Sequence, residues 1–340
     1  MWLSSSSVGR KFIMALTGAA LVLFVTFHCL MNAVAICWPT AYNSVCMFLG
    51  ANWYALLASA GLALLIFIHI IYAVMLTIQN RKARGNQRYA ISHRPKNVEW
   101  SSQNMLVLGI VILAFLVVHM IQFWAKMQLQ EIRGVEESMP PVAGTLFIQE
   151  AFSQPWTLIV YGIGFIALWF HLNHGFWSMF QSVGWDNTTW IPRLKCIGCW
   201  WVSIVILLFF AEGIVFTVKA SEGYYKNDPA LREQYKDMIM PMIEKDFGPD
   251  ADQIGLQITM MPYDQVSMGF RQMEAQVDQQ AKSLNTPEVK EQMKAHPEMA
   301  AQVEEMQKRD EALKRAVKFL DYLEEGEEKA APQTNMPYGY

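Results

Sequence analysis

The stretch from Trp156 to Trp185, WTLIVYGIGFIALWFHLNHGFWSMFQSVGW, decides the fold class of this chain. It contains no Asp, Glu, Lys or Arg, and it exceeds the ~20 apolar residues that a helix needs to cross a bilayer. His171 lies in its second half, and His174 follows one helical turn later. A histidine at that depth in hydrocarbon is costly, so it indicates a functional group with a partner.

Four other apolar runs are also long enough to span a membrane, which takes roughly 18 residues or more. No carboxylate precedes Glu99, although charged residues make up about a quarter of an ordinary soluble domain. We therefore expect an all-α membrane protein with a bundle of five transmembrane helices. The predicted spans are residues 12–37, 53–79, 104–125, 156–183 and 198–219.

Charge divides the chain into two parts. Residues 1–220 hold 13 Lys and Arg against 7 Asp and Glu, whereas residues 221–340 hold 14 against 23. We predict a membrane domain at 1–220 and a polar, acidic, mostly helical soluble extension at 221–340, with two or three helices. Within the extension, Asp228 and Thr286 precede prolines and are predicted helix N-caps. One apolar stripe recurs at helical spacing: Val303, Met306, Leu313, Val317 and Leu320.

Basic residues in the short loops predict the orientation, because cytoplasmic loops are enriched in Lys and Arg. The loop at 38–52 has none, whereas the next loop has six. The N-terminus and the second and fourth loops are therefore expected on the cytoplasmic side, with the C-terminal extension on the opposite side. We expect a multi-pass protein of the inner (cytoplasmic) membrane. The six residues are Arg81, Lys82, Arg84, Arg88, Arg94 and Lys96.

Four of the five spans carry a deep histidine. At about 1.5 Å of rise per residue, His28 and His119 lie roughly 15 Å and 10 Å below the outer edge. His69 and His171 both lie roughly 22–24 Å below it. Matched depths predict two bis-histidine haems, an outer one between His28 and His119 and an inner one between His69 and His171. Filling both axial positions leaves no oxygen site and makes each haem an electron carrier.

The four deep histidines could also serve without haem. Each could separately hydrogen-bond a neighbouring helix, whereas a copper or zinc centre would gather three or more ligands at one level. His171 and His174 are three residues apart and share one side of a helix, and depth does not decide between them as ligand. His174 is then a candidate contact for a haem propionate.

Glu212 is the only acidic residue within a predicted span. It lies roughly 10 Å from the outer edge, level with the outer histidines, and is a candidate for proton exchange at a quinone site. The alternative is a carboxylate that reaches for water among the lipid headgroups. Asn32 is a candidate hydrogen-bond partner for the quinone.

Together these motifs resemble the five-helix, di-haem cytochrome b subunit that anchors succinate dehydrogenases and quinol:fumarate reductases. A glycine stands ten residues before the histidine in TGAALVLFVTFH and in GIVILAFLVVH. In HLNHGFWSMFQSVGW, glycines follow the first histidine at four and thirteen residues, as in the family. The resemblance covers about residues 8–220. It implies four axial ligands, His28, His69, His119 and His171, and leaves His174 as an additional residue.

The resemblance implies a subunit that is not an enzyme on its own. A flavoprotein subunit interconverts succinate and fumarate, and an iron–sulfur subunit connects it to this anchor on the cytoplasmic face. Electrons then pass through two haems b to or from a quinone, expected to be menaquinone. Membrane lipid and a second copy of the complex are further expected contacts, and nucleic acid is not. Some quinol-oxidising members carry a glutamate where this chain has Trp169, which leaves Glu212 as the candidate proton carrier.

Two other functions remain open from the sequence. One is the di-haem cytochrome b anchor of another quinone-linked oxidoreductase, such as a hydrogenase or a formate dehydrogenase, whose histidine patterns differ. The other is a haem-free membrane scaffold whose acidic extension recruits a partner.

Overall fold

The computed structural model describes residues 6–50, 52–84, 99–134, 139–286, 289 and 296–325. Within these residues the chain is helical and contains no strand. Five helices are long and apolar enough to cross a membrane, which confirms the predicted all-α class and the number of such helices. They are α2 (Ser7–Cys37), α4 (Trp53–Arg84), α5 with the π turn η1 that continues it (Trp100–His119 and Met120–Trp124), α8 (Pro155–Ser182) and α9 (Trp190–Ser221).

The chain folds into two compact units. The first comprises Met1–Lys126 and Glu150–Val218, and the second comprises Met127–Gln149 and Lys219–Tyr340. The last segment of the second unit begins at Lys219. The second unit also takes residues 127–149, which we had expected within the membrane domain.

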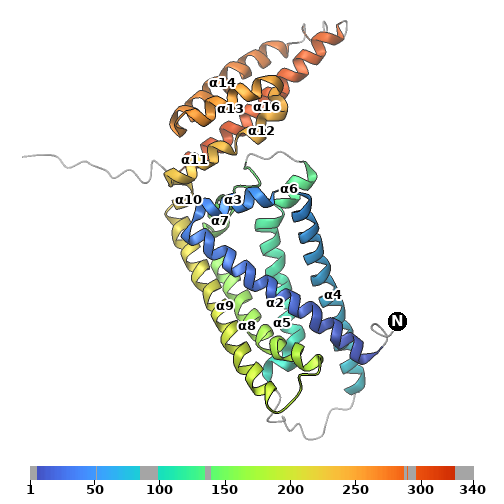
Figure 1. Ribbon diagram of the computed structural model, residues 1–340. Helices are drawn as coiled ribbons and strands as arrows, with labels where there is room; N and C mark the ends of the chain where they lie inside the picture. Colours follow the sequence, from blue (N-terminus) through green and yellow to red (C-terminus); the bar gives the residue numbers. More distant parts are fainter. Residues whose placement is uncertain are drawn as a thin grey trace, which may run out of the picture. The chain divides into compact units, whose positions relative to one another are not determined.

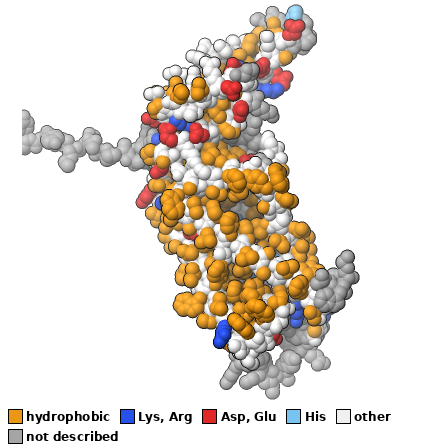
Figure 2. Space-filling view, viewed as in Figure 1, with side chains coloured by type: hydrophobic (Ala, Val, Ile, Leu, Met, Phe, Trp, Pro, Cys, Tyr) orange, Lys and Arg blue, Asp and Glu red, His pale blue; other side chains and the backbone are white. Residues whose placement is uncertain are grey.

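In the first unit the long helices lie side by side (Figure 1). Helix α2 packs against α4 and α8, and α5 packs against α8. Many large apolar side chains face outward, including Leu23 (71% exposed) and Leu57 (66% exposed). Figure 2 shows hydrophobic side chains over most of the visible face of these helices. Such a surface fits helices surrounded by lipid, since soluble monomers rarely expose apolar patches of this extent.

Short helices occupy two segments that were predicted as loops. Helix α3 (Pro39–Leu49) fills most of the segment at 38–52, and its Pro39 suits a first helical turn, where no amide hydrogen bond is lost. Helices α6 (Gln128–Arg133) and α7 (Gly144–Phe152) lie in the third connection. Several charged residues of the predicted loops lie outside the described residues: Arg88, Arg94, Lys96, Glu136 and Glu137.

The second unit holds more helices than the two or three expected, because prolines and glycines interrupt it repeatedly. Helix α16 packs against α14 and α12, with Leu313 and Leu320 fully buried, as the predicted stripe requires. The Asp228 carboxylate accepts the Leu231 N–H at 3.0 Å, which confirms that N-cap. Thr286 Oγ1 accepts from Val289 N at 3.4 Å, but Pro287 lies outside the described residues. The described α-helices that follow residue 221 are α10 (Tyr224–Asn227), α11 (Pro229–Asp237), α12 (Met240–Phe247), α13 (Ala251–Met260), α14 (Tyr263–Leu284) and α16 (Pro297–Glu324).

Candidate functional site

Two pairs of histidines face each other inside the first unit. His28 on α2 and His119 on α5 have ring centroids 5.8 Å apart, with planes at 79°. His69 on α4 and His171 on α8 have centroids 6.3 Å apart, with planes at 61°. One metal bound by two imidazoles, with bonds of about 2.0 Å on each side, places the centroids roughly 6 Å apart. The structure therefore brings together the two pairs that helical spacing predicts, at a separation that suits one metal in each.

A chain of hydrogen bonds leads away from His119. Its Nδ1 lies 3.1 Å from the Tyr161 hydroxyl, which donates to Gln122 Oε1 at 2.9 Å. Gln122 Nε2 donates to Thr157 Oγ1 at 3.2 Å, and Thr157 Oγ1 donates to the Ala151 carbonyl at 2.6 Å. Tyr161 and Thr157 are 5% and 0% exposed, so these two members of the chain are buried. We call His119, Tyr161, Gln122 and Thr157 the His119 relay.

The far end of the His119 relay fixes the direction of every hydrogen bond in it. A backbone carbonyl only accepts, so the Thr157 hydroxyl must donate its one hydrogen to the Ala151 carbonyl. The Thr157 oxygen then accepts a hydrogen bond from the Gln122 amide. The Gln122 oxygen then accepts the Tyr161 proton. The Tyr161 oxygen is left to accept from His119, whose Nδ1 must therefore carry the hydrogen. The Nε2 lone pair of His119 is consequently free to bind a metal.

The same reasoning applies to His69 at the other pair. The Thr17 hydroxyl donates into its own helix, to the carbonyls of Ile13 at 2.9 Å and Met14 at 3.1 Å. Its oxygen lies 3.1 Å from His69 Nδ1 and accepts the hydrogen there. One histidine of each pair is thus oriented by a second helix and presents Nε2. Orientation by a hydrogen bond from the other ring nitrogen is the usual arrangement for histidines that bind metals.

Further observations complete the description of the two pairs. His171 Nδ1 is buried and has no hydrogen-bond partner among the described residues, so no neighbouring side chain orients this ring as Tyr161 orients His119. The motif glycines Gly109 and Gly175 border open space, since a Cβ built on either would meet no atom within 4 Å. Aromatic rings surround the outer pair, with Phe24 stacked on His28 at 5.6 Å and Phe123 at 5.2 Å from His119. The donor set and its apolar surroundings therefore suit haem.

His174, one helical turn after His171 on α8, lies in a cluster of charged groups. Its Nδ1 is 3.5 Å from Glu99 Oε2, and the Lys195 ammonium is 2.6 Å from Glu99 Oε1. Partial burial opposes ionisation of Glu99, but the contacts with Lys195 and His174 outweigh it and lower the pKa of that carboxyl. The cluster ties α8 and α9 to the start of α5. The role of His174 as a propionate contact stays a prediction.

Glu212 is buried, with 3% of its surface exposed. Cys29 Sγ, next to His28 in the chain, donates to Glu212 Oε1 at 3.6 Å. Asn32 lies close enough to interact with the same carboxylate. Oε2 has no hydrogen-bond partner in the described part of the chain. The carboxylate is therefore enclosed between α2 and α9 and does not reach the surface of the unit.

Comparison of the chain with family models, curated proteins and solved structures finds no match.

Sequence reasoning missed the residues that orient the ligand candidates: Thr17, Gln122 and Tyr161. The available signal was polarity, because each is a hydrogen-bonding side chain inside an apolar span.

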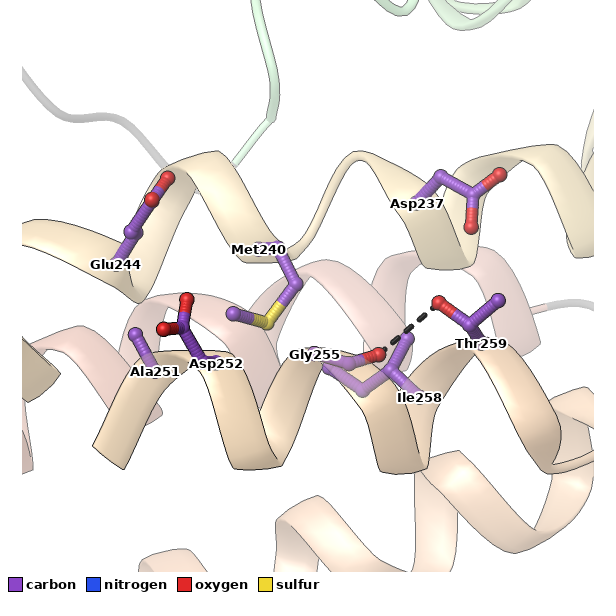
Figure 3. Close-up of a pocket in the computed structure, with 8 residues that line it drawn as sticks. All are labelled: Asp237, Met240, Glu244, Ala251, Asp252, Gly255, Ile258 and Thr259. Atoms are coloured by element: carbon purple, nitrogen blue, oxygen red, sulfur yellow. Dashed lines mark hydrogen bonds between the residues drawn. The ribbon is translucent and has the colours of Figure 1, made fainter. Parts of the chain in front are cut away.

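The second unit has a shallow pocket of about 310 Å³ between α12 and α13, shown in Figure 3. Glu244 and Asp252 lie at one end of it and Asp237 at the other, with Met240 between them. None of the histidines, Glu212 or Asn32 lines this pocket. It plays no part in the function proposed below.

Proposed function

We propose that the first unit binds two haems b, one between His28 and His119 and one between His69 and His171. The observation that supports this best is the orientation of His119 and His69. In each ring the hydrogen is held on Nδ1 by a hydroxyl of a neighbouring helix, which leaves the Nε2 lone pair free, and the ring of the partner histidine lies 5.8 or 6.3 Å away between centroids. Histidines that only join helices would not need this tautomer on both levels. Bis-imidazole haem supplies one-electron transfer and has no open position for oxygen.

The residues of the chain give each haem a distinct setting. Tyr161 and Thr17 hold the ligand rings in place, and the apolar rings of Phe24 and Phe123 lie beside the outer pair. An apolar setting strengthens the electrostatic influence of nearby dipoles and charges. Two haems at two depths then carry electrons across the thickness of the membrane.

The residue pattern further supports a membrane anchor subunit of a succinate dehydrogenase or quinol:fumarate reductase. Such a subunit exchanges electrons with an iron–sulfur subunit that lies on the cytoplasmic face beside a flavoprotein subunit. Its other exchange partner is quinone, with menaquinone the expected species. Glu212, enclosed beside Cys29 and Asn32, is the group placed to take up or release the proton that accompanies quinone turnover. The proposed orientation has the N-terminus on the cytoplasmic side and the second unit on the other side.

Co-purification from membranes tests the complex. A flavoprotein and an iron–sulfur subunit should accompany the chain, and the complex should interconvert succinate and fumarate with a quinone as electron partner. Recovery of the chain with a hydrogenase or formate dehydrogenase instead would keep the haems and replace the proposed partners.

A further inference from the structure

We infer that Tyr161, acting through the His119 relay, is a positioning residue that sets the reduction potential of the outer haem independently of the inner one. This inference rests on the proposed function and adds to it a division of labour between two second-helix hydroxyls. Tyr161 serves the His28/His119 level, and Thr17 serves the His69/His171 level.

The relay is built into the backbone of α5. Directly after His119 the helix leaves α geometry, and Met120–Trp124 forms a π turn with a 2.8 Å bond from Ala125 N to the Met120 carbonyl. Single π turns of this kind are frequent at functional sites. Gln122 lies in that turn and bonds both Tyr161 and Thr157 on α8. The departure from α geometry thus coincides with the residue that orients the Tyr161 hydroxyl.

The relay has a predictable electronic effect on iron. A hydrogen bond donated from Nδ1–H makes an imidazole a stronger base and a stronger electron donor through Nε2. A more electron-rich ligand favours ferric over ferrous iron, and this lowers the reduction potential. In the relay, Tyr161 is itself polarised by donating to Gln122, which makes its oxygen a better acceptor. The intact relay therefore holds the outer haem at a lower potential than it would have without it.

The two levels are electronically separate in this respect. The His119 relay ends at the Ala151 carbonyl, whereas the Thr17 hydroxyl donates to the carbonyls of Ile13 and Met14 in its own helix. These two sets of hydrogen bonds, as they run through the described residues, have no member in common. Each hydroxyl can therefore be removed without touching the other.

Potentiometric titration of the haems in the purified complex tests this inference with Tyr161→Phe and its matched control Thr17→Val. Each step of the titration is first assigned to the outer or the inner haem with the variants His119→Ala and His69→Ala. Tyr161→Phe should raise the potential of the outer haem alone, by up to about tenfold in its reduction equilibrium, about 59 mV for a one-electron couple. Thr17→Val should raise the potential of the inner haem alone. Each variant should also change the low-temperature electron paramagnetic resonance signal of its own haem only.

Wild-type protein with two haems whose outer potential is unmoved by Tyr161→Phe, or moves together with the inner one, overturns the inference while leaving the proposed function intact. Wild-type protein without haem removes the proposed function itself. If Tyr161→Phe fails to retain the outer haem, Gln122→Met decides, because it keeps the Tyr161 hydroxyl and removes the amide that accepts from Tyr161 and donates to Thr157. A rise in the reduction potential of the outer haem that is smaller than the one expected for Tyr161→Phe supports the inference. An unchanged reduction potential overturns the inference.

Discussion

The Tyr161 hydroxyl accepts the Nδ1–H of His119 across the interface of α5 and α8, with 3.1 Å between the two atoms. The direction of that bond follows from a backbone carbonyl three hydrogen bonds away, so residues joined to the Nδ1 side of the ring decide the tautomer of the histidine. A histidine prepared in this way is suited to bind metal through Nε2. Variants of the histidines and of the groups around them test this arrangement.

His171 and His174 should behave differently when removed. We expect His171→Ala to lose the inner haem and keep the outer one, because His171 faces His69 with centroids 6.3 Å apart. His174→Ala should keep both haems, because His174 contacts Glu99 instead. Haem content per chain, measured on purified protein, separates the two variants. Equal loss from both would show that the ligand has been assigned to the wrong histidine.

Glu212→Gln should slow quinone turnover while both haems and their spectra persist. The amide keeps the size of the side chain and its hydrogen bonding, but it cannot exchange a proton. Steady-state turnover with a soluble quinone analogue measures the loss, and Glu150→Gln is the matched control, since that carboxylate is partly exposed and paired with Lys126. Equal turnover in Glu212→Gln and wild type would leave the buried carboxylate with a structural role only.

Gly164→Ala should disturb the outer level. A Cβ at Gly164 would lie 2.5 Å from Phe115 Cγ, and the Phe115 ring lies 5.0 Å from Tyr161 and 6.0 Å from His119. Overpacking of this kind costs about 1–3 kcal/mol and should lower the thermal midpoint of the first unit. Gly162→Ala is the control, because its Cβ meets Phe210 at an ordinary 3.5 Å. Identical midpoints and haem content in the two variants would contradict the close packing described here.

Glu99 should contribute to stability only above acidic pH. Its contacts with Lys195 and His174 lower the pKa of the folded state despite partial burial, so the contribution is complete above the ordinary carboxyl pKa of about 4.3. It should fade as the pH falls through the lowered value. Because Glu99 is partly exposed, Glu99→Gln should cost less than about 1 kcal/mol near neutrality. Thermal midpoints of the two proteins should converge as the pH falls, and a constant gap across the whole range would rule out the ion pairs as its source.

The sequence predicted those features that depend on one helix at a time. Apolar length located the five long helices, and rise per residue sorted His28, His69, His119 and His171 into two pairs. It could not predict that Thr17 meets His69, because that contact depends on how far each helix is rotated about its axis when it packs.

The short helices and the π turn could not be predicted, because their formation depends on local features other than apolar periodicity. Helix α3 and the short helices of residues 127–149 are too brief for periodicity to be distinctive, and their ends are set by proline and glycine. The π turn after His119 is a local departure that no apolar pattern records. In the second unit, Asp228 was found in advance because capping is a local chemical rule.

Haem content and spectrum of the purified chain test the central claim most directly. A reduced-minus-oxidised spectrum should show b-type bands, and quantification should give two haems per chain, falling to one in His119→Ala and to one in His69→Ala. A chain that is folded and helical, has been supplied with haem during expression, and still shows no b-type bands would contradict the proposal that these histidines bind haem.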